Sequence, residues 1–358
     1  MNYRTVELLS RSSFTSDITK VIDIDISDPI SNILLRLETT NSAATMTAHP
    51  LAGLVDIVVV DGSDVLFSLD GYEAEALDWY SQGGKFRSNY NYYLNGGTSS
   101  RFVGLNFGRW LWDRLYALDP KRFNNLQLKV SIDIDAGGMS CATTYLTVWA
   151  NCFDERTPEL RGFLSSKELK QYTMASTVHD YTDLPTDYPY RALYFRAFLL
   201  GTEPNGSLSN FKLSEDQGKR VPIDLGAHAL NSNLMAAYGP VEEHVYFATG
   251  TSARYIYCAP TTRVEAHLTT WAAASSGHIH AAYNGDGGRL DVITNTTGDN
   301  CQVFIRGWVP HCVYEIPFGM KDDPDDAYEV SRIGSLKADI TGGAAAQGFI
   351  FVQQYRHY

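Results

Sequence analysis

Two stretches of the chain repeat the same order of hydrophobic and polar positions. Residues 55–80 (VDIVVVDGSDVLFSLDGYEAEALDWY) predict a strand, a tight turn at 61–64, a second strand and a short helix. The turn is indicated by Gly, which adopts positive φ, and by Asp and Ser, which hydrogen-bond their own backbone. Asp70 as N-cap, with Glu73 three residues later, indicates where the helix begins. Residues 211–238 have the same order and also end in a short helical run.

A second pair of segments is similar in the same way. Residues 126–153 and 336–358 each predict a strand, a Gly-Gly pair with small polar residues, and an aromatic-rich strand. Two ordered elements that recur in one sequence favour two similar β domains in tandem. The alternative is that unrelated β segments use the same turn residues.

Strand-like segments predominate in the rest of the chain. Residues 18–27 alternate, with Ile22, Ile24 and Ile26 on one face, which is typical of a half-buried strand. Similar segments recur at roughly 8–12-residue spacing with turn residues between them, which predicts an antiparallel sandwich or barrel in each half. Residues 109–118 (RWLWDRLYAL) are the best helix candidate.

The length sets the number of domains. At 358 residues the chain exceeds the roughly 250 at which single cores stop growing. We predict an N-terminal arm over residues 1–17, a first sandwich over 18–160, a proline-marked extended linker over 161–188 and a second sandwich over 189–358. Residues 81–98, rich in Gly, Asn, Ser and Tyr, predict a surface loop of a kind suited to binding another surface.

Charge narrows the function classes. The net charge of −12 argues against a surface that coats nucleic acid broadly, because phosphate binding needs a concentrated basic face. Arg4, Arg11 and Lys20 leave a local basic patch open near the N-terminus. A solvated arm is the alternative interpretation of these residues.

Cysteine usage and hydropathy bear on the compartment. The five cysteines form no C-x-x-C pair, which indicates reduced, packed thiols in a cytosolic folding compartment. They are Cys141, Cys152, Cys258, Cys301 and Cys312. The N-terminus lacks the apolar core of a signal peptide, and no apolar run approaches the ~20 residues of a membrane helix. We expect the protein to meet a membrane only from outside it.

Two histidines near residue 280 are the first metal candidate. His278 and His280 share one face of a predicted strand, as the metal ligands of cupins do. The cupin pattern also needs a glutamate a few residues later, and residues 281–285 contain none. A third ligand would have to come from His244, His267 or His311. Solvent-facing strand histidines are the favoured interpretation.

Carboxylate pairs are the other chemical candidates. Asp23 with Asp25, and Asp133 with Asp135, lie two residues apart on predicted strands. A glycosidase needs two acids about 5–10 Å apart in a cleft, whereas alternation with Ile favours a wet sheet face. The acidic residues of 322–326 could bind Ca²⁺, but the EF-hand glycine and terminal glutamate are missing, which favours a solvated loop. We therefore predict no catalytic, cofactor-binding or metal-binding residue, no cofactor and no enzyme.

The order of predicted strands, turns and short helices resembles that of a known family. The units at 55–80 and 211–238, with the proline-marked entry into 188–200 (YPYRALYFRAFLL), resemble the double-jelly-roll major capsid proteins of tailless icosahedral viruses, especially bacteriophages with an internal membrane. Residues 145–162 and 301–319 are similar to the closing strands of single-jelly-roll capsid subunits of small RNA viruses.

This resemblance implies an all-β fold of two tandem jelly-roll β-sandwiches, a double jelly roll, with a few short helices. It implies a structural protein that is made in the host cytoplasm and forms pseudo-hexagonal homotrimers tiling the virion shell. Minor capsid or penton proteins would be further partners, and the N-terminal arm would face an internal membrane or the genome. The alternative function is a carbohydrate-binding or adhesin protein, fibre- or spike-like, on the same kind of sandwich.

Overall fold

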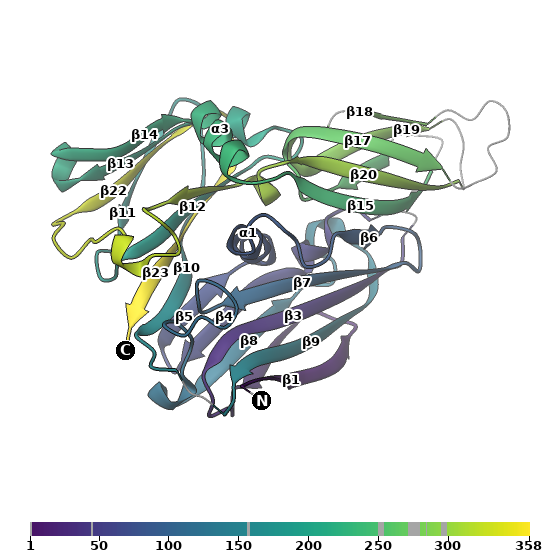
Figure 1. Ribbon diagram of the computed structural model, residues 1–358. Coiled ribbons are helices and arrows are strands. Elements are labelled where there is room, and N and C mark those ends of the chain that lie inside the picture. Colours follow the sequence, from purple (N-terminus) through teal and green to yellow (C-terminus); the bar gives the residue numbers. More distant parts are fainter. Residues whose placement is uncertain are drawn as a thin grey trace.

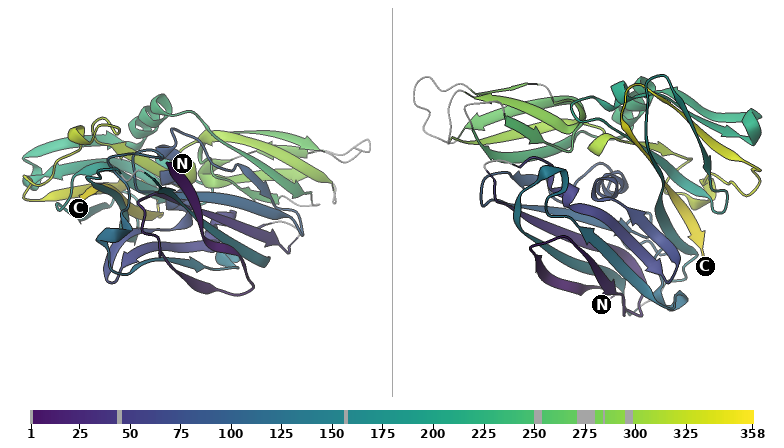
Figure 2. Two further views of the ribbon diagram at one scale, coloured as in Figure 1. Left: turned by 60° about the horizontal axis from the view of Figure 1, so that its bottom comes forward. Right: turned by 180° about the vertical axis from the view of Figure 1, so that it is seen from behind.

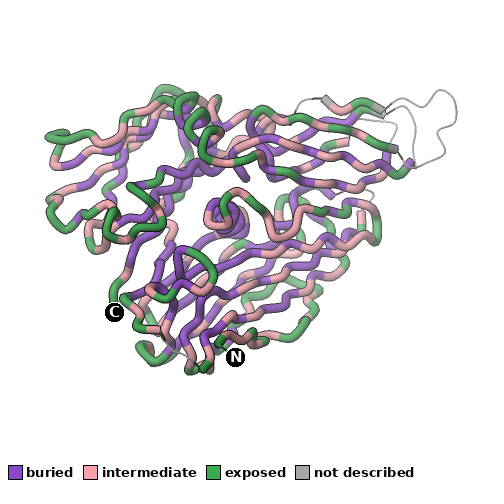
Figure 3. Tube along the Cα trace, in the orientation of Figure 1, coloured by how far each residue is buried: buried purple, intermediate pink, exposed green. Residues whose placement is uncertain are grey.

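The alternating segments become strands of five sheets, and the computed structural model shows their order. It describes residues 2–43, 46–155, 158–249, 254–270, 280–283, 285–294 and 299–358. Buried residues are concentrated in α1 and along the middle of the strands, while exposed residues gather at the turns and chain ends (Figure 3). No helix in these ranges is long and apolar enough to cross a membrane.

The N-terminal half forms a first sandwich of two four-stranded arrays, ordered β1-β9-β3-β7 and β2-β8-β4-β5 (Figure 1). When the eight strands of this sandwich are numbered along the chain, their order is 1-8-3-6 in one array and 2-7-4-5 in the other. This is a jelly roll. Its strands are β1 (Tyr3–Phe14), β2 (Ile18–Asp23), β3 (Ile30–Asn41), β4 (Leu54–Asp61), β5 (Asp64–Leu69), β7 (Thr98–Asn106), β8 (Leu126–Ile132) and β9 (Cys141–Phe153).

The C-terminal half repeats this topology. Its arrays are β10-β23-β12-β21 and β11-β22-β13-β14, so the eight strands occupy the same places as in the first sandwich. The prediction of two tandem jelly rolls is thereby confirmed. The strands are β10 (Gly162–Thr173), β11 (His179–Leu184), β12 (Tyr190–Phe198), β13 (Leu208–Glu215), β14 (Arg220–Gly226), β21 (Val313–Pro317), β22 (Leu336–Gly342) and β23 (Gln347–His357).

The two jelly rolls share one sheet. Strand β5 of the first pairs in parallel with β10 of the second, at Phe67 with Ser166 and at Ser68 with Lys167. This short pairing joins β2-β8-β4-β5 and β10-β23-β12-β21 into a single eight-stranded sheet. A continuous backbone ladder therefore holds the two sandwiches in a fixed relation.

The second jelly roll carries an insertion between its fifth and sixth strands. The insertion is a small sandwich of its own that extends away from the rest of the chain (Figures 1 and 2). One layer is β17-β20-β15-β6, in which β6 comes from the first sandwich and pairs in parallel with β15; the other is β16-β19-β18. The strands are β6 (Tyr90–Tyr92), β15 (Val241–Ala248), β16 (Arg254–Tyr257), β17 (Thr262–Thr270), β18 (His280–Tyr283), β19 (Arg289–Thr294) and β20 (Asn300–Trp308).

Helix α1 (Gly71–Ser81) follows β5 and lies between the two sandwiches and the insertion (Figure 1). Asp70 and Glu73 form a capping box, in which each side chain accepts from the other's backbone N–H. The predicted start of this helix is confirmed. Helix α3 (Ala227–Ala237) occupies the same position in the second jelly roll, after β14. The remaining helices are short: α2 (Pro204–Ser207), η1 (Pro50–Gly53), η2 (Pro120–Arg122), η3 (Ala136–Gly138), η4 (Asp216–Gly218), η5 (Asp286–Gly288), η6 (Pro310–Cys312) and η7 (Pro324–Asp326).

Three predicted segments were wrong. The arm over 1–17 is mostly β1, paired with β9, and the linker over 161–188 contains β10 and β11. Both β1 and β10 carry bulges, which interrupt the two-residue alternation that would have marked them as strands. The helix over 109–118 is a non-helical loop in which the Asp113 carboxylate accepts from backbone N–H groups on both sides of it.

Candidate functional site

The first sandwich, the second sandwich and the insertion meet at a buried cluster of charged side chains beside α1. We call Arg101, Glu75, Glu243, His49 and His311 the junction cluster. Arg101 comes from β7, Glu75 from α1, and Glu243 from β15 of the insertion. His49 precedes η1 in the first sandwich, and His311 lies in η6 just before β21. All five side chains are at most 4% exposed.

Arg101 connects the two carboxylates. Its Nε and Nη2 donate to Oε1 and Oε2 of Glu75 at 2.9 and 2.6 Å. Its Nη1 donates to Oε1 of Glu243 at 2.8 Å. The guanidinium also lies 5.1 Å from the centre of the Phe86 ring. One cation therefore binds the helix of the first sandwich to a strand of the insertion.

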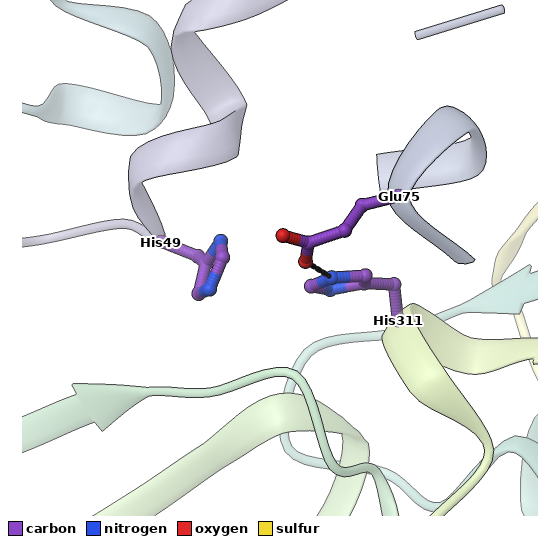
Figure 4. Close-up of side chains that lie close together, drawn as sticks. All are labelled: His49, Glu75 and His311. Carbon is purple, nitrogen blue, oxygen red and sulfur yellow. Dashed lines mark hydrogen bonds and ion pairs between the residues drawn. The ribbon is translucent and has the colours of Figure 1, made fainter. Parts of the chain in front are cut away.

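The two histidines extend the cluster on either side (Figure 4). His311 places Nε2 2.7 Å from Oε2 of Glu75, and His49 places Nε2 3.0 Å from Oε1 of Glu243. The Nδ1 of His49 accepts from the backbone N–H of Leu51, and its Nε2 donates to Glu243. The imidazoles meet edge to face, with centroids 5.0 Å apart.

The electrostatics of the cluster follow from burial and pairing. Burial alone would raise the pKa of Glu75, but Arg101 and His311 outweigh it and hold that pKa below its usual value. For Glu243, burial is likewise outweighed by His49 and Arg101, which bring its pKa to about 2. Burial lowers the pKa of His311 to about 4, against the opposing hydrogen bond to Glu75. At neutral pH both carboxylates are ionised and His311 is neutral.

A cavity of about 380 Å³ adjoins the cluster. His49 and His311 line it, together with residues of all three parts of the chain. Its walls are mainly apolar, and the polar groups in them include the Arg196 guanidinium and the thiols of Cys258 and Cys312. Arg196 is itself paired with Asp70 at 2.8 Å.

The outer face of the insertion carries a row of rings across four strands. In register, His267 of β17, Phe304 of β20, His244 of β15 and Tyr90 of β6 lie side by side. Tyr90 stacks on His244 with centroids 4.8 Å apart, and Tyr92 stacks on its β15 neighbour. Part of the predicted surface loop over 81–98 thus becomes β6, an edge strand of this sheet.

Three of the predicted metal candidates lie in the part of the chain that the structure describes, and these three do not gather at one place. His278 and the side chain of His280 lie outside the described residues. His244 and His267 lie on the outer face of the insertion, whereas His311 lies in the junction cluster.

The predicted carboxylates lie at turns and exposed faces. Asp23 and Asp25 are exposed, and Asp23 accepts from Gln127. Asp133 and Asp135 gather with Asp17 at a turn. In the acidic loop, Asp323 caps η7 and Asp326 accepts from the N–H of Met320.

Two of the three N-terminal basic residues are paired within the chain. Arg4 donates to Asp28 at 2.6 Å, and Arg11 donates to Glu38 at 2.8 Å and lies over the Tyr145 ring. Residues 3–14 are therefore a paired strand and not a free arm, and contact of this segment with a membrane or genome stays a prediction. The five cysteines are free and buried, as predicted.

Sequence reasoning missed the junction cluster. The available signal was a charged residue inside an apolar segment, as at Arg101 in β7 and Glu75 in α1. That signal marks a residue that needs a buried partner without indicating which one. The partners come from positions up to 236 residues apart, and only the fold brings them together.

The arrangement of strands defines the class of fold, a double jelly roll, and comparison with solved structures agrees. The major capsid protein of Sulfolobus turreted icosahedral virus matches with a TM-score of 0.63 at 11% identity, covering 100% of this chain and 98% of that one. The major capsid protein P2 of bacteriophage PM2 matches with a TM-score of 0.56 at 12% identity, covering 99% and 98%. VP54 of PBCV-1 matches with a TM-score of 0.58 at 11% identity, covering 99% and 93%.

These matches span the whole described chain and show its fold. No protein-family model matches the sequence, and no curated protein matches it either.

Proposed function

We propose that this chain is the major capsid protein of an icosahedral virus and serves as a structural subunit, not as an enzyme. The match of 99–100% of the chain to three capsid proteins is the observation that supports this most. The duplicated jelly roll gives the proposal a geometric basis. Three chains with two upright sandwiches each would present six similar units, and a pseudo-hexagonal outline tiles a shell with few distinct contacts.

A tile of this kind needs a fixed relation between its two sandwiches. The parallel pairing of β5 with β10 provides it through backbone hydrogen bonds, and in the junction cluster His311 of η6, just before β21, forms a hydrogen bond with Glu75 of α1. The ion pair between Asp64 at the start of β5 and Arg356 near the end of β23 adds a further link. Loss of this rigidity would let the six units lose their common orientation.

The homotrimer would hold together through large contacts and the shell through weaker ones. Weak contacts between trimers let misplaced units leave before the shell closes. Minor capsid or penton proteins would fill the positions that a pseudo-hexagonal tile cannot occupy. The protein would be made in the host cytoplasm and reside in the virion.

Light scattering with negative-stain imaging of the same purified sample tests the proposal. We expect a species of three times 39.8 kDa with a hexagonal outline, or closed shells. A chain that stays monomeric at high concentration across a range of salt would contradict it.

The ring row on the insertion is the observation that favours a second candidate, a glycan-binding adhesin. A glycan stacks on exposed ring faces, whereas here Tyr90 and His244 cover each other's faces. Their outward edges suit contact with another protein surface better. A glycan array separates the two functions, since an adhesin would bind sugars as a small oligomer and a capsid protein would not.

A further inference from the structure

We propose that His49, Glu75 and His311 bind one divalent transition-metal ion of the zinc class where the two sandwiches and the insertion meet. One ligand atom from each residue lies within 4.8 Å of the other two. Zn²⁺ binds imidazole nitrogen at about 2.0–2.1 Å and carboxylate oxygen at about 2.0–2.2 Å. The proposal replaces the sequence-based prediction that the chain has no metal-binding residue.

The group is close to the geometry that an ion needs. The Nε2 of His311 and Oε2 of Glu75 lie 2.7 Å apart, so a modest separation admits an ion between them. His49 then closes the set by a rotation of its imidazole toward Glu75, the direction in which one of its ring nitrogens already points (Figure 4). The proton now on Nε2 of His311 moves to the other ring nitrogen, so the ring stays neutral when it binds the ion.

The neighbours of the three ligands hold them in place. Glu243 accepts from Nε2 of His49, and its other oxygen accepts from the backbone N–H of Ala259. Arg101 donates to both oxygens of Glu75, and the lone pair of Oε2 that now accepts from Nε2 of His311 would bind the ion instead. Outer hydrogen bonds of this kind orient metal ligands and contribute to their affinity.

The charge of the site favours a cation. Arg101 carries one positive charge against the two carboxylates of Glu75 and Glu243 with which it pairs. A cation bound beside these carboxylates would compensate the second negative charge, which is costly away from water. The adjoining cavity of about 380 Å³ has room for a water ligand in an open fourth position and for entry of the ion.

The donor set determines which ions fit. Two imidazoles and a carboxylate suit Zn²⁺, Co²⁺ or Ni²⁺, whereas Ca²⁺ and Mg²⁺ prefer oxygen ligands. A bound ion would connect the first sandwich, through His49 and α1, to η6 at the base of the second. It would strengthen the fixed relation between the sandwiches without being needed for the capsid function proposed above.

Metal titration of the purified full-length chain tests this site. After treatment with EDTA and dialysis, the chain is exposed to Zn²⁺ or Co²⁺ and the bound metal is measured by mass spectrometry. We expect one ion per chain, a visible absorption band for Co²⁺ typical of four-coordination, and a higher melting temperature with Zn²⁺ but not with Mg²⁺.

Variants assign the ligands. H49Q and H311Q should each weaken Zn²⁺ binding by at least about tenfold. H228Q, at an exposed histidine of α3, is the matched control and should bind as the wild type does. Circular dichroism establishes that each variant is folded. The Co²⁺ spectrum is measured on the wild type, so that test stands even where a variant fails to fold. Less than a tenth of an ion per wild-type chain with no Co²⁺ band, or unchanged binding by H311Q, would overturn the proposal.

Discussion

Replacing Arg101 with Met should destabilise the chain more than any change to a surface ion pair. Arg101 is fully buried and donates three hydrogen bonds to Glu75 and Glu243. Without it two carboxylates remain buried with no cation between them. Removing one partner from a buried ionic network costs about 3–5 kcal/mol, most of it from the uncompensated charges. We expect R101M to lower the free energy of unfolding by that amount.

Urea titration followed by tryptophan fluorescence measures this loss. Trp79 is a suitable reporter, because it is buried in α1 and packs near Phe86, which also contacts the Arg101 guanidinium. The matched control is R161M, since Arg161 and Asp325 are both exposed in their ion pair. Exposed pairs contribute about 0–1 kcal/mol, so R161M should leave the midpoint nearly unchanged.

A combined variant separates the two parts of the reasoning. If uncompensated charge is the cause, changing Glu75 and Glu243 to Gln in the R101M background should recover part of the lost stability. A loss below about 1 kcal/mol for R101M, equal to that of the surface control, would refute the reasoning, because the cluster would then be hydrated despite its burial.

Three further predictions concern α1 and the link between the sandwiches. G71A should lower the free energy of unfolding by about 1–3 kcal/mol through overpacking, because a Cβ at this position would lie 2.7 Å from backbone and side-chain atoms of the first sandwich. In the same thermal melt the control G239A, where a Cβ has no atom within 4 Å, should leave the stability unchanged. Burial, with nearby carboxylates, raises the pKa of Glu73 well above its usual value. The stability that Glu73 contributes is therefore present at low pH and is lost as pH rises through its folded-state pKa. E73Q should flatten the resulting fall in melting temperature from pH 5 to 9, and an unchanged slope would count against this prediction. The hydrogen bond from Arg356 lowers the pKa of Asp64, so the stability that their link contributes is present at neutral pH and is lost as pH falls through the lowered folded-state pKa. D64N should therefore reduce the urea midpoint at pH 7, and the difference from the wild type should shrink as the pH is lowered below about 4.

The parts of the fold that were predicted depend on neighbouring residues. The unit of β4, β5 and α1 was recognisable because its turn and its capping box each involve residues at most three apart. The unit of β13, β14 and α3 followed from its likeness to the first. Strands β1 and β10 were missed because their bulges break the alternation on which strand prediction depends.

The loop over 109–118 shows why local pattern can mislead. Its apolar residues have helical spacing, but Asp113 draws Arg109 and the neighbouring backbone into a loop, and Leu118 pairs with Ile30 of β3. Helical propensity is worth only tenths of a kcal/mol per residue, so buried ionic and tertiary contacts outweigh it.

The sequence by itself determined that this is a protein of short strands, with two similar halves and a short helix after the same strand pair in each. Those features follow from alternation, turn residues and caps, all of which act within a few residues. Only the tertiary structure decided that the pairing of β5 with β10 joins the two jelly rolls into one sheet, and that β6 of the first sandwich pairs with β15 of the insertion. It also decided that Arg101, Glu75, Glu243 and the two histidines meet, because a buried charge in a sequence indicates the need for a partner while the fold alone selects it.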